Sequence, residues 1–183
     1  MEVKLGNCRI TVDFGFPAVL ALILLAADRN FLLKVLAVGL LHECGHGLAM
    51  WLTGAGLREI RLCGTGIQMR TRTAVLSERA QNLIYLAGPA VNLLFGILLW
   101  TAQKELALLH LCMGSFNLLP YRCLDGGAVL GNLAGDRTRP LTIGCVMLSG
   151  LLLLLLIWQH IRNPLLYLLL GYLAVNEVRK KDF

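Results

Sequence analysis

The chain has 183 residues, of which 57% are hydrophobic and 15% are charged, and its formal net charge is +6 at pH 7. Soluble domains average about 45–50% apolar and about 25% charged residues, so this composition excludes a disordered chain and favours a membrane protein. The basic residues are scattered at the edges of apolar runs with little aromatic interleaving, which argues against a nucleic-acid partner.

Six apolar stretches predict an all-α polytopic membrane protein, built as a bundle of six transmembrane helices. A helix needs roughly 20 apolar residues to cross a bilayer, and the second, third and fifth stretches reach this length easily. The shorter stretches can cross inside a bundle where the bilayer thins locally. The expected spans are about residues 14–27, 31–53, 79–101, 105–120, 139–160 and 163–176.

The charge distribution predicts which side of the membrane each loop occupies. With six spans, the side that holds both termini carries most of the lysines and arginines, whereas the other side carries Arg29, Lys104 and Arg162. Cytoplasmic loops are enriched in basic residues. Both termini are therefore expected in the cytoplasm.

A small membrane-associated β-hairpin is predicted between the second and third helices, at about residues 58–72. Two segments that alternate apolar and polar residues flank Gly64-Thr65-Gly66, which is a turn signal. The apolar residues expected on one face are Ile60, Leu62, Ile67 and Met69, with the arginines on the other face. Two interpretations stay open: a cationic surface that touches anionic headgroups, and an edge strand that pairs with an extended peptide.

The second span contains the sequence H-E-C-G-H, an H-E-x-x-H motif. Helical spacing of four places His42 and His46 on one face, where both can bind one Zn²⁺, with Glu43 beside them as the general base. Ionisable residues inside an apolar stretch are costly and mark a functional site. Gly45 and Gly47 would allow another helix to approach this one closely.

A catalytic zinc site needs a third protein ligand. His110 and His160 fall nearer the non-cytoplasmic ends of their spans, whereas His42 and His46 lie in the cytoplasmic half of theirs. Asp125 of the sequence L-D-G-G follows the fourth span at its cytoplasmic end and can fold back beside the histidines. An ordinary turn or helix-cap aspartate would have the same surroundings, so both interpretations of Asp125 stay open here.

Three motifs, in their order along the chain, resemble the site-2 protease family of intramembrane zinc metalloproteases. They are H-E-C-G-H at 42–46, A-G-P-A-V-N ending at Asn92, and N-L-L-P from Asn117 leading to L-D-G-G at 124–127. The resemblance spans about residues 10–180 and is strongest to the stage IV sporulation protein FB branch. Residues 1–183 are expected to form a single integral-membrane metalloprotease domain without a PDZ or CBS module.

The resemblance implies hydrolysis of peptide bonds in membrane-embedded or membrane-associated proteins near the cytoplasmic face of a bacterial cell membrane. A sporulation transcription-factor precursor is the kind of substrate that the branch implies. The implied roles are ligands of one Zn²⁺ for His42, His46 and Asp125, general base for Glu43, and substrate binding for Asn92 and Asn117. Regulatory membrane proteins and further copies of the chain are additional expected partners.

Two other functional classes would use the same residues. An intramembrane metal transporter needs histidine and aspartate ligands but has no need of Glu43 as a base. A catalytically inactive membrane scaffold would keep the fold and bind a partner. Full biological activity of Glu43→Gln would contradict the protease and favour the transporter, whereas the complete set of motifs argues against the scaffold.

Overall fold

The computed structural model describes residues 1–6, 8–26, 28–63, 66–73, 75–135, 138–160 and 164–178. The chain divides into two compact units, Met1–Phe116 and Asn117–Phe183, and each unit is described by itself. The turn residues Gly64 and Thr65, Arg162 and the first residue of the last expected span lie outside the described residues.

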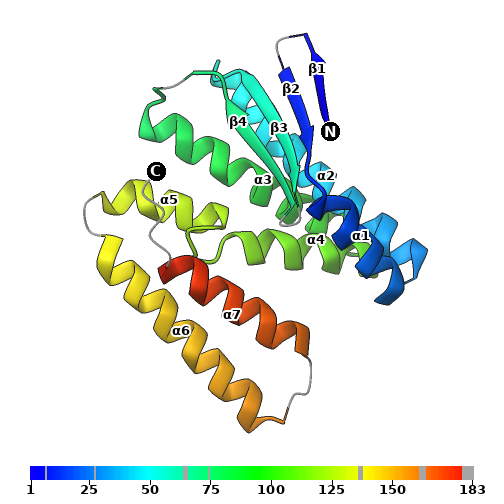
Figure 1. Ribbon diagram of the computed structural model, residues 1–183, viewed down its shortest axis with the longest axis vertical. Coiled ribbons are helices and arrows are strands. Elements are labelled where there is room, and N and C mark those ends of the chain that lie inside the picture. Colours follow the sequence, from blue (N-terminus) through cyan, green and yellow to red (C-terminus); the bar gives the residue numbers. More distant parts are fainter. Residues whose placement is uncertain are drawn as a thin grey trace. The chain divides into compact units, whose positions relative to one another are not determined.

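The first unit combines a small sheet with helices (Figure 1). Its strands are β1 (Glu2–Leu5), β2 (Cys8–Val12), β3 (Leu57–Cys63) and β4 (Gly66–Thr71). Its helices are α1 (Gly15–Ala26), α2 (Arg29–Leu52), α3 (Glu78–Leu99) and α4 (Lys104–Asn117), the last of which ends at the boundary with the second unit.

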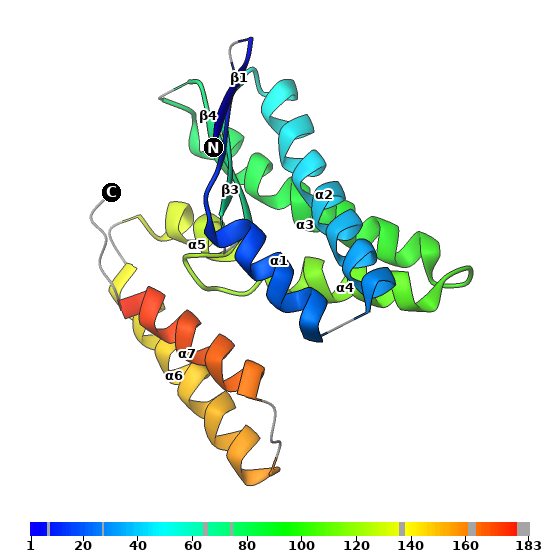
Figure 2. The ribbon, with the colours of Figure 1, turned by 45° about the vertical axis from the view of Figure 1, so that its right-hand side comes forward.

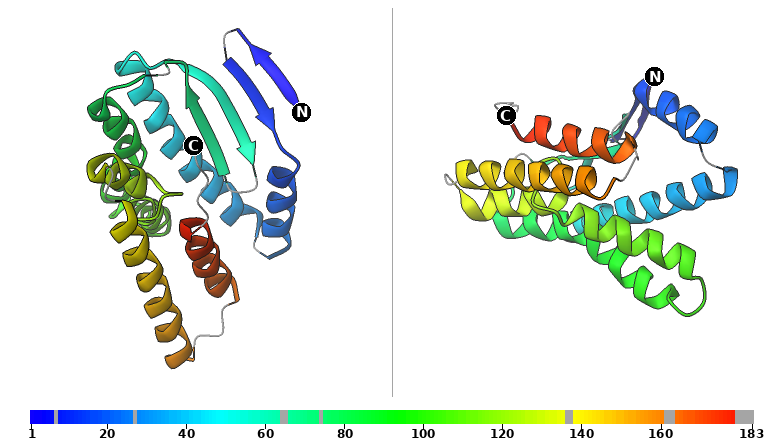
Figure 3. Two further views of the ribbon diagram at one scale, coloured as in Figure 1. Left: turned by 60° about the vertical axis from the view of Figure 1, so that its left-hand side comes forward. Right: turned by 90° about the horizontal axis from the view of Figure 1, so that it is seen from below.

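The four strands form one sheet in the order β1-β2-β3-β4, seen face-on in the left view of Figure 3. Strands β3 and β4 pair antiparallel where the sequence predicts a hairpin, whereas β2 pairs parallel to β3. Ile60 lies opposite Met69 and Leu62 opposite Ile67, so these apolar side chains share a face as expected. The predicted hairpin is thus half of a four-stranded sheet. Strands β1 and β2 were not predicted.

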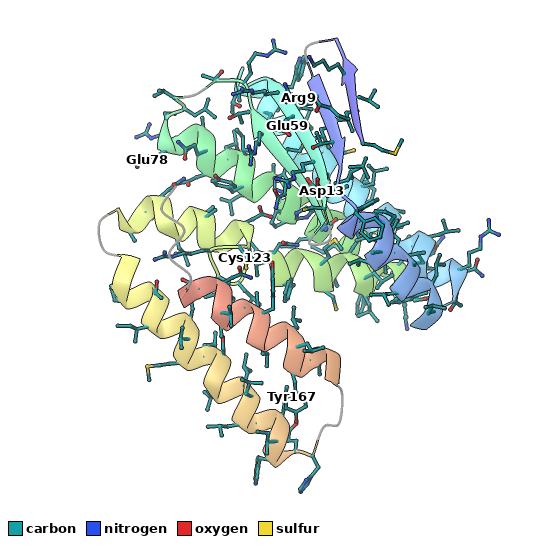
Figure 4. All side chains as sticks on the ribbon, in the orientation of Figure 1. Arg9, Asp13, Glu59, Glu78, Cys123 and Tyr167 are labelled. Atoms are coloured by element: carbon teal, nitrogen blue, oxygen red, sulfur yellow. The ribbon has the colours of Figure 1, made fainter. Side chains whose placement is uncertain are left out.

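The charged residues of the sheet pair with one another. Arg61 on β3 donates from Nε to the Asp13 carboxylate at 2.8 Å, and Arg70 on β4 lies 3.8 Å from Glu59. Figure 4 places Asp13 between β2 and α1, and Glu59 on the sheet. The hydrogen bond to Asp13 is the larger cause of a raised pKa of Arg61, and the negative charge of Asp13 is the next. The hairpin is therefore less cationic than its arginines alone indicate.

The core of the first unit lies where the sheet meets α2 and α3. Its buried residues are Ala49, Met50, Ala55 and Ile84, and the partly buried Leu57, Met69, Leu76 and Ala87 pack against them. Helices α2 and α3 pack against each other, and Figure 2 shows them crossing. Side-chain caps start both helices, with Asp28 accepting from the Phe31 N–H at 2.8 Å and Ser77 from the Ala80 N–H at 3.3 Å. The α2–α3 pair is the scaffold of the candidate site.

Two described helices, not the six expected, are long and apolar enough to cross a membrane: Arg29–Leu52 and Glu78–Leu99. Helices α1, α4 and α7 (Pro164–Val178) have 12, 14 and 15 residues. At about 1.5 Å per residue they fall short of a hydrocarbon core about 30 Å thick. In α6 (Thr138–Trp158), the apolar part Thr142–Trp158 is also short. The apolar stretches in the sequence ran on into residues that the structure places in turns and loops.

The second unit contains α5 (Asp125–Ala134), α6 and α7. Helices α6 and α7 lie side by side (Figures 1 and 2). The segment before α5 is tied to α6, because the buried Tyr121 hydroxyl lies 2.8 Å from the Ser149 hydroxyl and the Cys145 thiol donates to the Pro120 carbonyl at 2.8 Å. Helix α5 was not predicted from the sequence.

Candidate metal centre

His42 and His46 lie one turn apart on α2 with their rings directed at a common point. Their Nε2 atoms are 3.0 Å apart, and the two side chains are only 5% and 7% exposed. The ring centroids are 4.7 Å apart with an interplanar angle of 82°. The spacing of four in the sequence therefore produces the pair of converging nitrogens that it predicts.

The outer nitrogen of each ring contacts α3. His46 Nδ1 lies 2.7 Å from the Ile84 carbonyl oxygen, and because a carbonyl only accepts, this nitrogen carries the ring proton. The proton on Nδ1 leaves the lone pair of His46 on Nε2, the atom that faces His42. At the other ring the direction is reversed, because the Asn92 side-chain nitrogen donates to His42 Nδ1 at 3.1 Å. Histidine ligands of metals are oriented in this way by hydrogen bonds from their outer nitrogen.

Two glycines shape the space around the imidazoles. A Cβ on Gly88 of α3 would overlap the His46 ring and lie 2.8 Å from His42 Nε2. A Cβ on Gly45 would lie 2.7 Å from the Ala87 carbonyl oxygen, so the close approach expected at this glycine is confirmed. Among the described residues nothing lies within 4 Å of a Cβ on Gly47, so the same expectation for Gly47 is wrong. Gly88 was not recognised as a site residue in the sequence.

The remaining predicted residues of the first unit are Glu43 and Asn92. Glu43 is half-buried on α2, next to His42 in the sequence. Asn92 is fully buried on α3 with an exposure of 0%, and its amide lies between His42 and His110, with Oδ1 3.1 Å from His110 Nδ1. The contact with His110 could not be seen in the sequence, and the substrate-binding role of Asn92 stays a prediction.

Asp125 and Asn117 belong to the second unit, so their relation to the histidines stays a prediction. Asp125 is the first residue of α5 and is half-buried, and Asn117 is the last residue of α4. The two glycines that follow Asp125 are buried, and a Cβ on either would overlap the backbone at Leu118 or Tyr121. The loop from α4 therefore packs against the first turn of α5, as the glycines after Asp125 indicate.

The donor set of the first unit fits a zinc ion. Imidazole nitrogens are ligands that Zn²⁺ prefers, and the Cβ-free position at Gly88 leaves space beside the Nε2 atoms of both rings. Asp125, the first residue of α5, stays the predicted third ligand. The histidines can thus hold a metal, with Glu43 on the same helix as a proton acceptor.

The chain is similar to two proteins from Methanocaldococcus jannaschii, described here and in the next paragraph. A zinc metalloprotease is 30% identical over 114 residues, which is 55% of this chain and 32% of that protein. The chain thus spans about a third of this curated relative. No protein-family model matches the chain.

The second match is a solved structure, a site-2 protease. It is 22% identical, with a TM-score of 0.69, over 97% of this chain and 93% of that one. The match covers nearly the whole of both chains, including the sheet as well as the helices. The chain has the fold of a site-2 protease.

Proposed function

We propose that the protein is an intramembrane zinc metalloprotease of the site-2 type. The observation that carries the proposal is the 3.0 Å approach of His42 and His46 Nε2 on the apolar helix α2, with Glu43 beside them. The fold and the name of the curated relative support the same class of enzyme. In this proposal His42, His46 and Asp125 hold one Zn²⁺.

Each side chain then has a separate task in peptide-bond hydrolysis. The imidazoles present Nε2 to the metal, and the Ile84 carbonyl keeps His46 in the required tautomer. A bound Zn²⁺ supplies Lewis acidity toward the scissile carbonyl and toward a water. The Glu43 carboxylate accepts the proton of the attacking water and returns a proton to the leaving amine.

The membrane orientation follows from charge. In the first unit, the end where α2 leads into β3 and β4 leads into α3 carries Arg58, Arg70, Arg72 and Arg79, all of them exposed. The opposite end carries Arg29 and Lys104, and there Lys34 pairs with Glu105. By the positive-inside rule, we place the sheet and the N-terminus on the cytoplasmic side.

The substrate is proposed to meet β4. Strand β3 is paired on both sides, whereas β4, within the described part of the chain, has a strand on one side only. A cavity of about 360 Å³ adjoins β4 and is lined by residues that include Met50, Met69, Arg70, Ile84 and Tyr85. Ile84 also provides the carbonyl that holds His46. An extended peptide on β4 would therefore run beside the metal-binding helices, with one side chain in the cavity.

The motif resemblance to the stage IV sporulation protein FB branch adds a class of substrate to the proposal. A membrane-associated transcription-factor precursor would be cut near the cytoplasmic face. Co-expression of the protein with such precursors tests this choice, because cleavage changes the length of the tagged precursor on a gel.

The proposed activity is tested with Glu43→Gln. Purified wild-type protein in detergent is expected to cut a membrane-associated substrate in a zinc-dependent manner. Glu43→Gln is expected to retain the metal and to lose at least about 10²-fold in rate, because it lacks the proton acceptor. Undiminished activity of Glu43→Gln would reject the protease in favour of a transporter or a scaffold.

A further inference from the structure

A chain of buried polar contacts runs from the metal-binding helix across α3 to α4. Asn92 has its side-chain nitrogen 3.1 Å from His42 Nδ1 and its oxygen 3.1 Å from His110 Nδ1. The three side chains are 5%, 0% and 3% exposed for His42, Asn92 and His110. The His110 ring is also stacked on Phe95, with centroids 5.7 Å apart and an interplanar angle of 27°. His110 is therefore fixed in place and in contact with the amide.

The hydrogen bonds that link His110, Asn92 and His42 can all point in one of two directions. A neutral imidazole has one N–H and one lone pair, and an amide has a donating NH₂ and an accepting oxygen. In the direction shown by the structure, His110 Nδ1–H donates to Asn92 Oδ1 and Asn92 Nδ2–H donates to His42 Nδ1. The His42 proton is then on Nε2, where it can donate to His46 Nε2 at 3.0 Å.

A metal on His42 Nε2 requires the opposite direction. The lone pair must then be on Nε2, so the His42 proton moves to Nδ1 and needs an acceptor there. Asn92 provides one by turning its amide through half a rotation, which brings Oδ1 to His42 and the NH₂ group to His110. His110 Nδ1 must then present a lone pair, with its proton on Nε2. Each ring keeps one proton, so the total charge of His42, Asn92 and His110 is unchanged.

We propose that His110 is a positioning residue whose tautomer reverses when metal binds. Asn92, which contacts both rings, couples the tautomer of His110 to that of His42. The inference rests on the proposed function, in which His42 is a metal ligand. His110 stabilises the metal-bound tautomer of His42 because, within the described part of the chain, it is the residue that receives the NH₂ group of the turned amide. A buried NH₂ group without an acceptor would be costly, so loss of the His110 acceptor weakens metal binding.

Nitrogen NMR of the wild-type protein reads the tautomers directly. The chain has 4 histidines, so a sample labelled with ¹⁵N-histidine gives few signals, and His110→Asn and His160→Gln assign two of them. Without metal, His110 Nδ1 is expected to give the shift of a protonated nitrogen. With Zn²⁺ it is expected to give the shift of a nitrogen with a lone pair. An Nδ1 that stays protonated with zinc bound would overturn the proposal.

Zinc affinity of variants gives an independent test. His110→Leu removes the acceptor and is expected to raise the zinc dissociation constant about tenfold, within the range for groups that orient metal ligands. His110→Asn places an amide oxygen near the former Nδ1 and is expected to recover most of the affinity. Cys112→Ser, at an exposed position of α4 two residues from His110, is the matched control and is expected to stay within about twofold of wild type.

The outcomes separate this inference from the proposed function. Equal zinc affinity of His110→Leu and wild type would overturn the inference and leave the protease intact. Failure of the wild type itself to bind zinc would reject the metal site. If His110→Leu does not fold in detergent, the NMR measurement on wild type and the affinity of His110→Asn decide.

Discussion

The Nδ1 atom of His46 on α2 lies 2.7 Å from the backbone carbonyl oxygen of Ile84 on α3. This contact joins the two longest apolar helices of the first unit at the metal-binding residue. It fixes the tautomer of His46, and the side chain of Ile84 is part of the core shared with the sheet. The geometry of the candidate metal centre is therefore a property of the α2–α3 pair and not of α2 alone.

The space beside Gly88 can be tested by adding one methyl group. Gly88→Ala places a Cβ 2.8 Å from His42 Nε2 and against the His46 ring, so the imidazoles must move apart. Overpacking of this kind costs about 1–3 kcal/mol, and we expect zinc affinity to fall at least about tenfold. Isothermal titration with Zn²⁺ measures this affinity. Gly47→Ala, which meets open space, is the control and should bind like wild type.

The proposed substrate edge can be tested with proline. Gln68→Pro is expected to abolish cleavage, because proline lacks an N–H and disturbs strand β4 where a peptide would pair. Zinc content should be unchanged, since residue 68 is on the sheet and the ligands are on helices. Cleavage at the normal rate would contradict the edge-strand proposal. Val3→Pro, on the strand at the other edge of the sheet, is the matched control and is expected to cleave normally.

The loop that precedes Asp125 is tied to α7 by a buried carboxylate. Glu177 is 2% exposed and accepts from the Arg122 backbone N–H at 3.0 Å, with the Arg122 Nε 3.2 Å away. Glu177→Ala should lower the free energy of unfolding by about 1.5–3 kcal/mol, measured by denaturation in detergent. Glu177→Gln keeps an acceptor and should cost less.

An exposed ion pair provides the comparison for Glu177. Lys34 and Glu105 are 37% and 63% exposed in their side chains, so their attraction is screened by solvent. Glu105→Ala should therefore cost at most about 1 kcal/mol. If Glu105→Ala lowered the free energy of unfolding more than Glu177→Ala, burial would not determine which of these two ion pairs stabilises the protein more.

Local patterns in the sequence predicted much of the site. The spacing of His42 and His46 produced converging nitrogens, and the alternation around Ile60 and Met69 produced a paired face of the sheet. These features depend on a helix or a strand alone. The contacts of Asn92 with His42 and His110 depend on how three helices pack, and no spacing in the sequence encodes that packing.

The expectations that failed also have physical causes. Strands β1 and β2 are 4 and 5 residues long, too short for their alternation to stand out, although Gly6-Asn7 between them is a turn signal. The count of six spans treated apolar composition as helix length. The structure ends several of those helices after 12 to 15 residues. Composition reports burial or lipid contact, whereas a span also requires an uninterrupted helix.

The most direct test of the account is the zinc content of detergent-purified protein, measured for wild type, Glu43→Gln and Asp125→Ala. We expect about one zinc per chain in wild type and in Glu43→Gln, and much less in Asp125→Ala, because a catalytic site is held by three protein ligands. Absence of zinc from all three proteins after purification in zinc-containing buffer would contradict the metalloprotease and leave a membrane scaffold with this fold.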